Sequence, residues 1–343
     1  MGEAILQIMM HLTAALVGGQ EATLLFAGDA MMHQAQIDAA RNAGNGKGFD
    51  YSTCFSGVEN IIKEADFAVV NLETPIGKDG FSGYPCFNAP VAYAETLHNA
   101  GFDLFLTANN HTLDRHDKGL RYTVEALDSL KIPHIGTYTD ISQRSERIPH
   151  IETINGFKVG FLNYTYGTNG IEIQGNAIVD YIDRDKIRED IRKTREAGAE
   201  LLVTAMHWGE EYRLMPVASE RSLADFLVDE GVDMIIGSHP HVVQPFEMRT
   251  NPLTGRKALV VYSLGNFISN MKTRDTRGGA LAVVKLSRDS VGQPCVSDAR
   301  YELVFTVPPE GNSQSNFMVY PIDSVPPHWT QAADAFRTAL KTD

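Results

Sequence analysis

The sequence predicts an α/β protein, because short β-rich runs alternate with helical patterns along most of its length. The runs TLLFAGDA, FAVVNLE and FDLFLTAN are apolar at first and end in polar residues, and loops or helical stretches separate them. With 343 residues, 43% of them hydrophobic, the chain can bury a large core. No long linker and no internal repeat divides it into independent parts.

The order of the predicted elements indicates one main domain over residues 22–325. We expect strands, most of them running into a loop, within residues 23–30, 67–73, 102–109, 134–138, 158–166, 200–209, 232–241 and 258–267. We expect helices within residues 56–64, 91–100, 117–130, 184–197 and 219–230. The first strand opens onto a loop that includes the Gly-rich segment 42–49. Residues 279–287, residues 296–305 and the Pro-rich stretch after them have the pattern of antiparallel strands that close the sheet. A C-terminal helix is expected within 326–343.

Net charge and cysteine content argue against several classes of protein. The formal net charge is −13, from 30 Lys and Arg against 43 Asp and Glu, so we expect no nucleic-acid partner. Surface carboxylates account for most of this acidic excess, and a cation site accounts for part of it. Cys54, Cys86 and Cys295 form no C-x-x-C pair, which argues against a structural zinc knuckle and leaves one Cys54–Cys86 bridge open.

The N-terminal stretch, residues 1–21, has two interpretations. Its apolar run AILQIMMHLTAALVGG has the length of a signal-peptide core and precedes small residues, but it lacks a positively charged start. It is therefore either the remnant of a signal peptide or an N-terminal helix. We expect an extracytoplasmic protein, periplasmic or membrane-associated, with a cytoplasmic one as the alternative. Fractionation of native cells tests this, because a wholly cytoplasmic protein with Met1 intact would contradict export.

Polar side chains with metal-binding chemistry cluster just after successive predicted strands. They occur in the segments GDAMMH, NLE, NNHTLD, HWG and GSHPH, at Asp29, His33, Glu73, Asn110, His111, His207, His239 and His241. The carboxyl ends of parallel strands meet at one edge of a sheet, so we expect these groups to converge there. Carboxylates, an amide and imidazoles together suit ions such as Zn, Mn or Fe. A shared carboxylate could hold two ions about 3.5–4 Å apart.

The ordered series of these segments, over about residues 23–268, resembles the bacterial capsule-synthesis (polyglutamate, CapA-like) family of the calcineurin-like metallophosphoesterases. The resemblance implies a four-layer α/β/β/α sandwich of the metallophosphoesterase type. It also implies two divalent metal ions (Mn, Zn or Fe) held by six residues: Asp29 and His241 for one ion, Asn110, His207 and His239 for the other, and Glu73 as a bridge.

The same resemblance implies that His111 faces the substrate and protonates a leaving group, while Asp114 orients it. Imidazole titrates near neutral pH, and a carboxylate partner would hold its tautomer, so the chemistry suits a general acid. The alternative for Asp114 is a helix N-cap for the run that begins after Arg115.

Two features depart from the superfamily pattern. The first motif is usually D-x-H, whereas His33 follows Asp29 by four residues, so we expect His33 to contact substrate rather than metal. Glu73 in NLE replaces the common G-D dipeptide, which fits the capsule branch. Asn266 in SLGNF follows another predicted strand, and we consider both a substrate contact and a simple turn of the chain.

These observations favour a metal-dependent hydrolase of capsule or poly-γ-glutamate biosynthesis or processing that uses water activated by two ions. Its substrate would be an anionic polymer or a phosphate-containing molecule, and its partner the membrane-bound capsule synthesis machinery. One alternative is a phosphoesterase acting on small phosphate esters or nucleotides. Another is a non-catalytic scaffold that binds an envelope polymer, and His111 beside the metal ligands argues against it.

Overall fold

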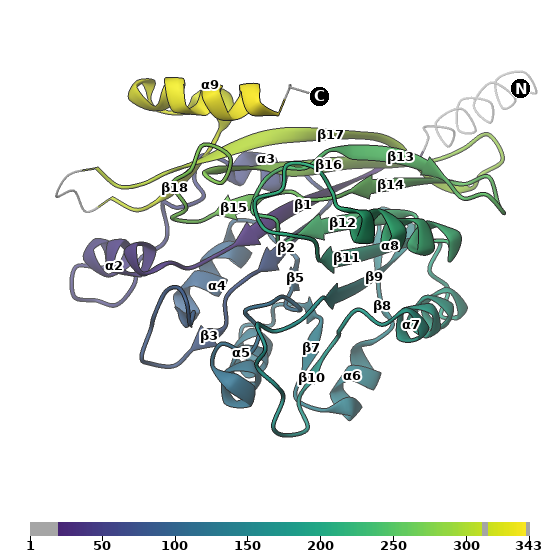
Figure 1. Ribbon diagram of the computed structural model, residues 1–343, viewed down its shortest axis with the longest axis horizontal. Coiled ribbons are helices and arrows are strands. Elements are labelled where there is room, and N and C mark those ends of the chain that lie inside the picture. The colour runs from purple at the N-terminus through teal and green to yellow at the C-terminus, as the bar shows by residue number, and fades with distance from the viewer. Residues whose placement is uncertain (1–19, 311–314, 341–343) are drawn as a thin grey trace, which may run out of the picture.

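The computed structural model describes residues 20–310 and 315–340 and consists of two β-sheets stacked face to face, with helices on both outer faces (Figure 1). The first sheet has the strand order β18-β17-β16-β1-β2-β5-β6, and β15 also pairs with β1. Its strands are β1 (Ala22–Ala30), β2 (Phe67–Leu72), β5 (Leu104–Leu106), β6 (His134–Ile135), β15 (Asn266–Ile268), β16 (Gly278–Arg288), β17 (Pro294–Val307) and β18 (Met318–Pro321). The strands β16, β17 and β18 pair antiparallel, as the sequence predicted for this part of the chain.

The second sheet has the order β13-β14-β12-β11-β9-β8. Its strands are β8 (His150–Ile154), β9 (Phe157–Thr165), β11 (Leu201–His207), β12 (Met234–Ser238), β13 (Phe246–Thr250) and β14 (Lys257–Val261). The four central strands are parallel, and β8 and β13 are antiparallel edges. Two further sheets have only two short strands each. One pairs β3 (Ile76–Gly77) with β4 (Ala89–Pro90), and the other pairs β7 (Thr137–Tyr138) with β10 (Ile178–Val179).

Helices complete the outer layers. The first sheet is covered by α2 (Gln34–Ala43), α3 (Glu59–Lys63), α4 (Val91–Asn99) and α5 (His116–Ser129), and the second by α7 (Arg184–Glu196) and α8 (Ala218–Asp229). Figure 1 shows α4 and α5 on one side of the sheets and α7 and α8 on the other. Two further helices are α6 (Ile141–Arg147) and α9 (Thr330–Ala339), the latter beside β17. The predicted α/β/β/α sandwich is confirmed.

The alternation of side chains along β1 explains why the layers hold together. Leu24 and Phe26 point into the core between the two sheets, where they join Phe161 of β9. Leu25 points the other way, into the core beneath the helices, where Tyr93 of α4 packs. A strand covered on both faces must be apolar throughout, which is why its sequence reads as a continuous hydrophobic run. Each such buried side chain contributes about 1.5–3 kcal/mol.

Several local expectations differ from the structure. The segment after β1 forms helix α2, whose alanine-rich sequence carries a weak apolar pattern, and not only a loop. The elements α6, β8 and β13 were also not predicted, because they are short and partly exposed. The Cys54–Cys86 bridge does not form, since Cys54 is a buried free thiol and Cys86 an exposed one.

The N-terminal stretch of residues 1–21 lies mostly outside the residues that the structure describes. The apolar stretch that suggested export falls almost entirely on residues 1–19, outside the described residues, so its two interpretations stay predictions. Among residues 20–310 and 315–340, the structure contains no helix long and apolar enough to cross a membrane.

Candidate metal centre

The carboxyl ends of strands from both sheets meet at one buried cluster. Asp29 at the end of β1, Glu73 after β2 and Asn110 after β5 come from the first sheet. The second sheet contributes three histidines from the end of β11 and the loop after β12: His207, His239 and His241. All six side chains are at most 3% exposed. The sequence placed these groups at one edge of a single sheet, and this is wrong, because the cluster lies where two sheets face each other.

Close backbone approaches position the first of these residues. Asp29 donates its backbone N–H to the Gly265 carbonyl at 3.0 Å, and a Cβ on the preceding Gly28 would overlap that same carbonyl. Only glycine at position 28 therefore lets β1 pass this close to the turn before β15. The pairing brings Asp29 opposite Asn266 in β15 and opposite Asn71 in β2.

The loop that carries two of the histidines has an unusual backbone. His239 has a φ of 99° and His241 a φ of 58°, both in the left-handed region that residues with a side chain rarely adopt. Such conformations persist only where surrounding contacts hold them, and they concentrate at functional sites. Here the His239 backbone N–H contacts the Asp29 carboxylate at 3.3 Å, which ties the loop to the opposite sheet.

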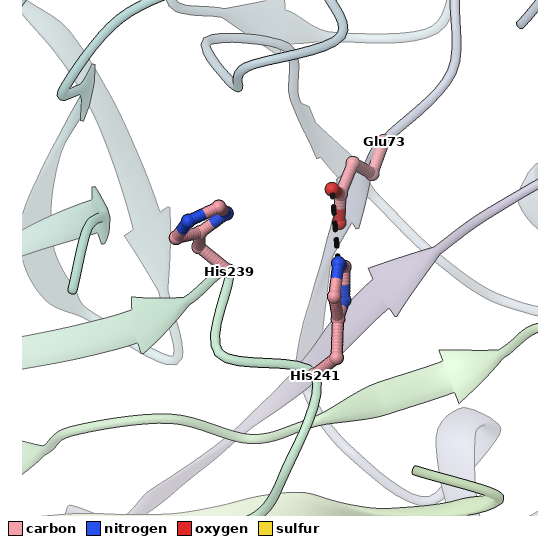
Figure 2. Close-up of side chains that lie close together, drawn as sticks. All are labelled: Glu73, His239 and His241. Atoms are coloured by element: carbon pink, nitrogen blue, oxygen red, sulfur yellow. Dashed lines mark ion pairs between the residues drawn. The ribbon is translucent and has the colours of Figure 1, made fainter. Parts of the chain in front are cut away.

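The side chains form two overlapping triads that share Glu73. Ligand atoms of Glu73, His239 and His241 lie within 4.8 Å of one another, and so do those of Asp29, Glu73 and His207. Figure 2 shows the Glu73 carboxylate facing the His241 ring, with His239 beside them. The Glu73 Oε1 atom is 3.7 Å from His207 Nε2 and 3.9 Å from His241 Nε2. A carboxylate common to both triads suits the predicted bridge.

The triads divide the ligands differently from the predicted assignment, which put Asp29 with His241 and placed Asn110, His207 and His239 together. Two contacts nevertheless match that assignment. Asp29 Oδ2 lies 3.2 Å from His241 Nδ1, and Asn110 Oδ1 lies 2.9 Å from His207 Nε2. The division of ligands between two ions stays a prediction.

Unpartnered buried atoms indicate that this donor set fits a cation. Within the described residues, both Glu73 carboxylate oxygens and His239 Nδ1 are buried without a hydrogen-bond partner. A buried polar atom without a partner costs about 1–3 kcal/mol, and a charged one costs more. Carboxylate, imidazole and amide ligands around these atoms would satisfy divalent ions of the Zn, Mn or Fe type.

The electrostatics of the cluster agree with cation binding. Burial, with the charge of Asp29, raises the pKa of Glu73 well above its usual value. Burial and the neighbouring histidines lower the pKa of His207 well below the usual value and that of His239 to about 4. Both rings are therefore neutral near pH 7, as metal ligands must be. Burial also acts to raise the pKa of Asp29, but the hydrogen bond and charge of His241 outweigh it and lower that pKa.

His111 and Asp114 form a buried pair beside the cluster. His111 Nδ1 lies 2.8 Å from Asp114 Oδ2, and the ring packs edge-on against Phe87 with centroids 4.5 Å apart. Asp114 also accepts the Phe87 backbone N–H at 2.8 Å. The alternative role of Asp114 as a helix N-cap is wrong, because the N-cap of α5 is Arg115 and no side chain caps that helix. Asp114 orients the imidazole and leaves its Nε2 atom for other partners.

Comparison with known proteins identifies the family to which this chain belongs. Residues 23–271 match the family model described as bacterial capsule synthesis protein PGA_cap. The chain belongs to this family. It is 27% identical over 273 residues to the capsule biosynthesis protein CapA of Bacillus anthracis, covering 76% of this chain and 63% of that protein. It is 25% identical over 275 residues to the PGA biosynthesis protein CapA of Bacillus subtilis, covering 78% and 68%.

Solved structures share the fold at low sequence identity. The NAD nucleotidase of Haemophilus influenzae superposes with a TM-score of 0.52 at 13% identity, over 93% of this chain and 56% of that one. The calcineurin-like phosphoesterase YfkN of Bacillus subtilis gives a TM-score of 0.49 at 15% identity, over 94% and 100%. The similarity to the NAD nucleotidase shows that a solved structure has the same fold class. At 13% identity it shows the fold alone.

In this PGA_cap protein, Asn266 contacts one of the candidate ligand histidines, and its predicted contact with substrate stays a prediction. Its Oδ1 is 3.0 Å from His241 Nδ1, its Nδ2 donates to the Thr276 carbonyl at 2.8 Å, and the residue is completely buried. The Nδ1 atom of His241 therefore faces two oxygens, from Asn266 and Asp29, and must carry the proton. This tautomer leaves the Nε2 lone pair directed toward Glu73, where a metal ligand needs it.

His33 lies outside both triads. Its Nδ1 faces the Asn270 backbone N–H at 3.3 Å, and its ring packs edge-on against Phe87. Burial lowers the pKa of His33 to about 4, and the hydrogen bond to Gln36 offsets only part of this effect. The ring is therefore neutral near pH 7, and its predicted contact with substrate stays a prediction.

Two positioning residues were missed at the sequence level. Asn71 donates to Asp29 Oδ1 at 2.8 Å, and the Ser238 hydroxyl lies 2.9 Å from His207 Nδ1. A signal for Asn71 existed, because it precedes Glu73 by two residues and alternate residues of a strand share a face. Trp208, which follows His207 in the chain, is a core residue that is buried and donates its indole N–H to the Tyr262 carbonyl.

Proposed function

We propose that this protein is a metal-dependent hydrolase that processes a capsule polymer of the poly-γ-glutamate type. The observation that carries the proposal is the partnerless Glu73 carboxylate, enclosed by His207, His239 and His241 and adjoined by the His111–Asp114 pair. The names of the two CapA relatives, which refer to capsule and PGA biosynthesis, support the polymer class. The chain spans 63% and 68% of their lengths, so the activity of the whole relatives is itself part of the proposal.

In this proposal the six buried residues would hold two divalent ions, and Glu73, which belongs to both triads, would be shared between them. Such ions supply Lewis acidity at an attacked carbonyl or phosphoryl group and make water a better nucleophile near neutral pH. Asp29 and Asn266 keep the proton of His241 on Nδ1, so that Nε2 is free to bind. The Ser238 hydroxyl, 2.9 Å from His207 Nδ1, can accept a proton from that atom and so orient His207 in a similar way.

The proton donor in this proposal is His111. Because Asp114 occupies Nδ1, a proton can be given from Nε2 to the nitrogen or oxygen that leaves the cleaved bond. In this hydrolysis the oxygen of water bonds to the attacked atom with one of its hydrogens, and its other proton passes to the solvent. The bond to the leaving group breaks as that group takes the proton from His111.

Metal content and turnover together test the proposal. Protein purified without chelator and reconstituted with Mn, Zn or Fe should carry up to two ions per chain by elemental analysis. It should then cleave γ-linked glutamyl polymers faster than phosphomonoesters or phosphodiesters. Less than about half an equivalent of metal would contradict the site. Full metal with cleavage of phosphate esters alone would favour the small-molecule phosphoesterase, and full metal without any turnover would favour a polymer-binding scaffold.

The setting of this activity follows from the same proposal. A capsule polymer is assembled at the cell envelope, so the protein would act outside the cytoplasm, beside the membrane-bound capsule synthesis machinery. The export interpretation of residues 1–21 is consistent with that location.

A further inference from the structure

Three exposed tyrosines lie against histidines in and beside the metal centre, although tyrosines elsewhere in the described chain are mostly buried. Tyr84, Tyr166 and Tyr212 are 72%, 48% and 54% exposed. They come from three separate loops: the one between β3 and β4, the one after β9 and the one after β11. We call them the tyrosine rim.

Each ring of the tyrosine rim lies against a different part of the site. The Tyr84 ring is 6.5 Å from that of His111. The Tyr166 ring stacks parallel to that of His207 at 6.4 Å and lies 4.7 Å from that of His239. The Tyr212 ring is 6.1 Å from that of His241. Each of the three rings thus lies beside a histidine of the site while about half of the residue or more remains exposed.

The backbone holds two of these rings in place. The Tyr166 N–H donates to the His207 carbonyl at 3.0 Å, and the Tyr212 N–H donates to the Pro240 carbonyl at 2.8 Å. Tyr212 also adopts a φ of 66°, in the left-handed region that a bulky residue avoids unless its surroundings impose it. This strain is maintained for a ring that packs only partly, which suggests selection for what the ring contacts outside the protein.

The chemistry of the rim differs from that of sites that hold phosphate with cationic side chains. Among residues 20–310 and 315–340, no lysine or arginine forms a hydrogen bond or ion pair with the three tyrosines, the six ligand candidates, His111 or Asp114. Sites that recognise phosphate usually employ such cations. Exposed tyrosines instead offer large, rigid contact surfaces and one hydroxyl each.

We propose that Tyr84, Tyr166 and Tyr212 bind successive units of an extended polyamide chain and lay one of its amide bonds across the metal centre. Flat amide groups stack on the rings, and the hydroxyls donate to the side-chain carboxylates. This inference rests on the proposed function, which supplies the polymer class, and adds the residues that select a chain over a small molecule.

Length-dependent binding tests the rim. We would titrate metal-reconstituted protein with γ-linked glutamate dimers and decamers and measure affinity by calorimetry, without relying on turnover. The wild type should bind the decamer more tightly than the dimer. Alanine at Tyr84, Tyr166 or Tyr212 should weaken decamer binding about 5- to 30-fold, the cost of truncating an aromatic anchor. Dimer binding and metal content should change little.

Matched variants separate this inference from unfolding and from the proposed function. Leu253→Ala removes an 85% exposed side chain from the turn between β13 and β14 and should leave decamer binding unchanged. Tyr84→Phe keeps the ring and should retain most of the affinity that Tyr84→Ala loses.

Unchanged decamer affinity in all three alanine variants would overturn the rim even if the protein cleaves the polymer. Tyrosine-dependent binding without cleavage would uphold the rim and contradict the hydrolase. Binding of a neutral glycan oligomer in place of the glutamyl decamer would overturn the polyamide assignment.

Discussion

Replacing His111 by alanine is expected to lower turnover about 10²- to 10⁴-fold while the metal content stays near that of the wild type. The reason is geometric: His111 is bound to Asp114 through Nδ1 and belongs to neither triad around Glu73. It can therefore supply a proton without holding an ion. Elemental analysis and initial rates on the same preparations provide the measurement. The loss should shrink for substrates with good leaving groups, because a weakly basic leaving group needs little protonation.

Two histidine variants serve as controls for His111→Ala. His239→Ala should lose metal first and activity as a consequence, since His239 Nδ1 is a buried atom of the first triad. His98→Ala should keep both, because His98 lies at the end of α4 and contacts the Phe102 carbonyl at 2.9 Å, away from the cluster. If His111→Ala strips metal, His111 is a ligand. If it changes neither metal nor turnover, the residue is structural and the mechanism lacks its proton donor.

Replacing Glu73 by glutamine is expected to weaken both metal ions at once, because a shared carboxylate that loses its charge weakens its attraction to each. The loss in affinity should reach at least the roughly 10- to 100-fold that removing an outer partner of a metal ligand costs. Competition with a chelator, read for each ion, measures it. Loss of one ion alone would contradict the bridge. Glu211→Gln is the matched control, because it removes a nearby exposed carboxylate that belongs to neither triad.

The same substitution should stabilise the metal-free protein at neutral and alkaline pH. Because the folded-state pKa of Glu73 is raised, its contribution is fully present below the unfolded-state value of 4.5 and is lost as the pH rises through the folded-state pKa. Glutamine has no proton to lose. The difference in free energy of unfolding between Glu73→Gln and wild type should therefore grow as the pH rises above about 4.5, to on the order of 1–3 kcal/mol.

Denaturant unfolding of chelated protein across pH 4.5–8 would measure this difference. The lowered pKa values of His207 and His239 add a loss of stability as the pH falls below 6.5. That loss occurs in both proteins and largely cancels in the comparison. A difference that shrinks with rising pH would show that Glu73 is ionised and stabilised in the metal-free protein, contrary to its partnerless carboxylate.

The sequence by itself determined the elements and the chemistry of the site. Residues such as Leu24 and Phe26 lie in a continuous apolar run, which is typical of a strand buried on both faces, and the polar segments that follow such runs mark where side chains converge. The His111–Asp114 contact was also within reach, because only three residues separate the partners and local chain geometry brings them together. These features depend on neighbours in the chain, which a sequence displays directly.

Only the tertiary structure decided how those elements combine. The hydrophobic pattern of a strand shows that both its faces are buried, but it does not show which strand pairs with it. The sequences of β1 and β11 therefore look alike, although the two strands belong to different sheets. For the same reason the predicted grouping of the other ligands around Glu73 differs from the two triads that the structure shows. The left-handed backbone at His239 and the rim formed with Tyr212 and Tyr166 depend on loops that are far apart in sequence. These loops come together because the two sheets pack against each other. That packing cannot be predicted from the hydrophobic periodicity of any single segment.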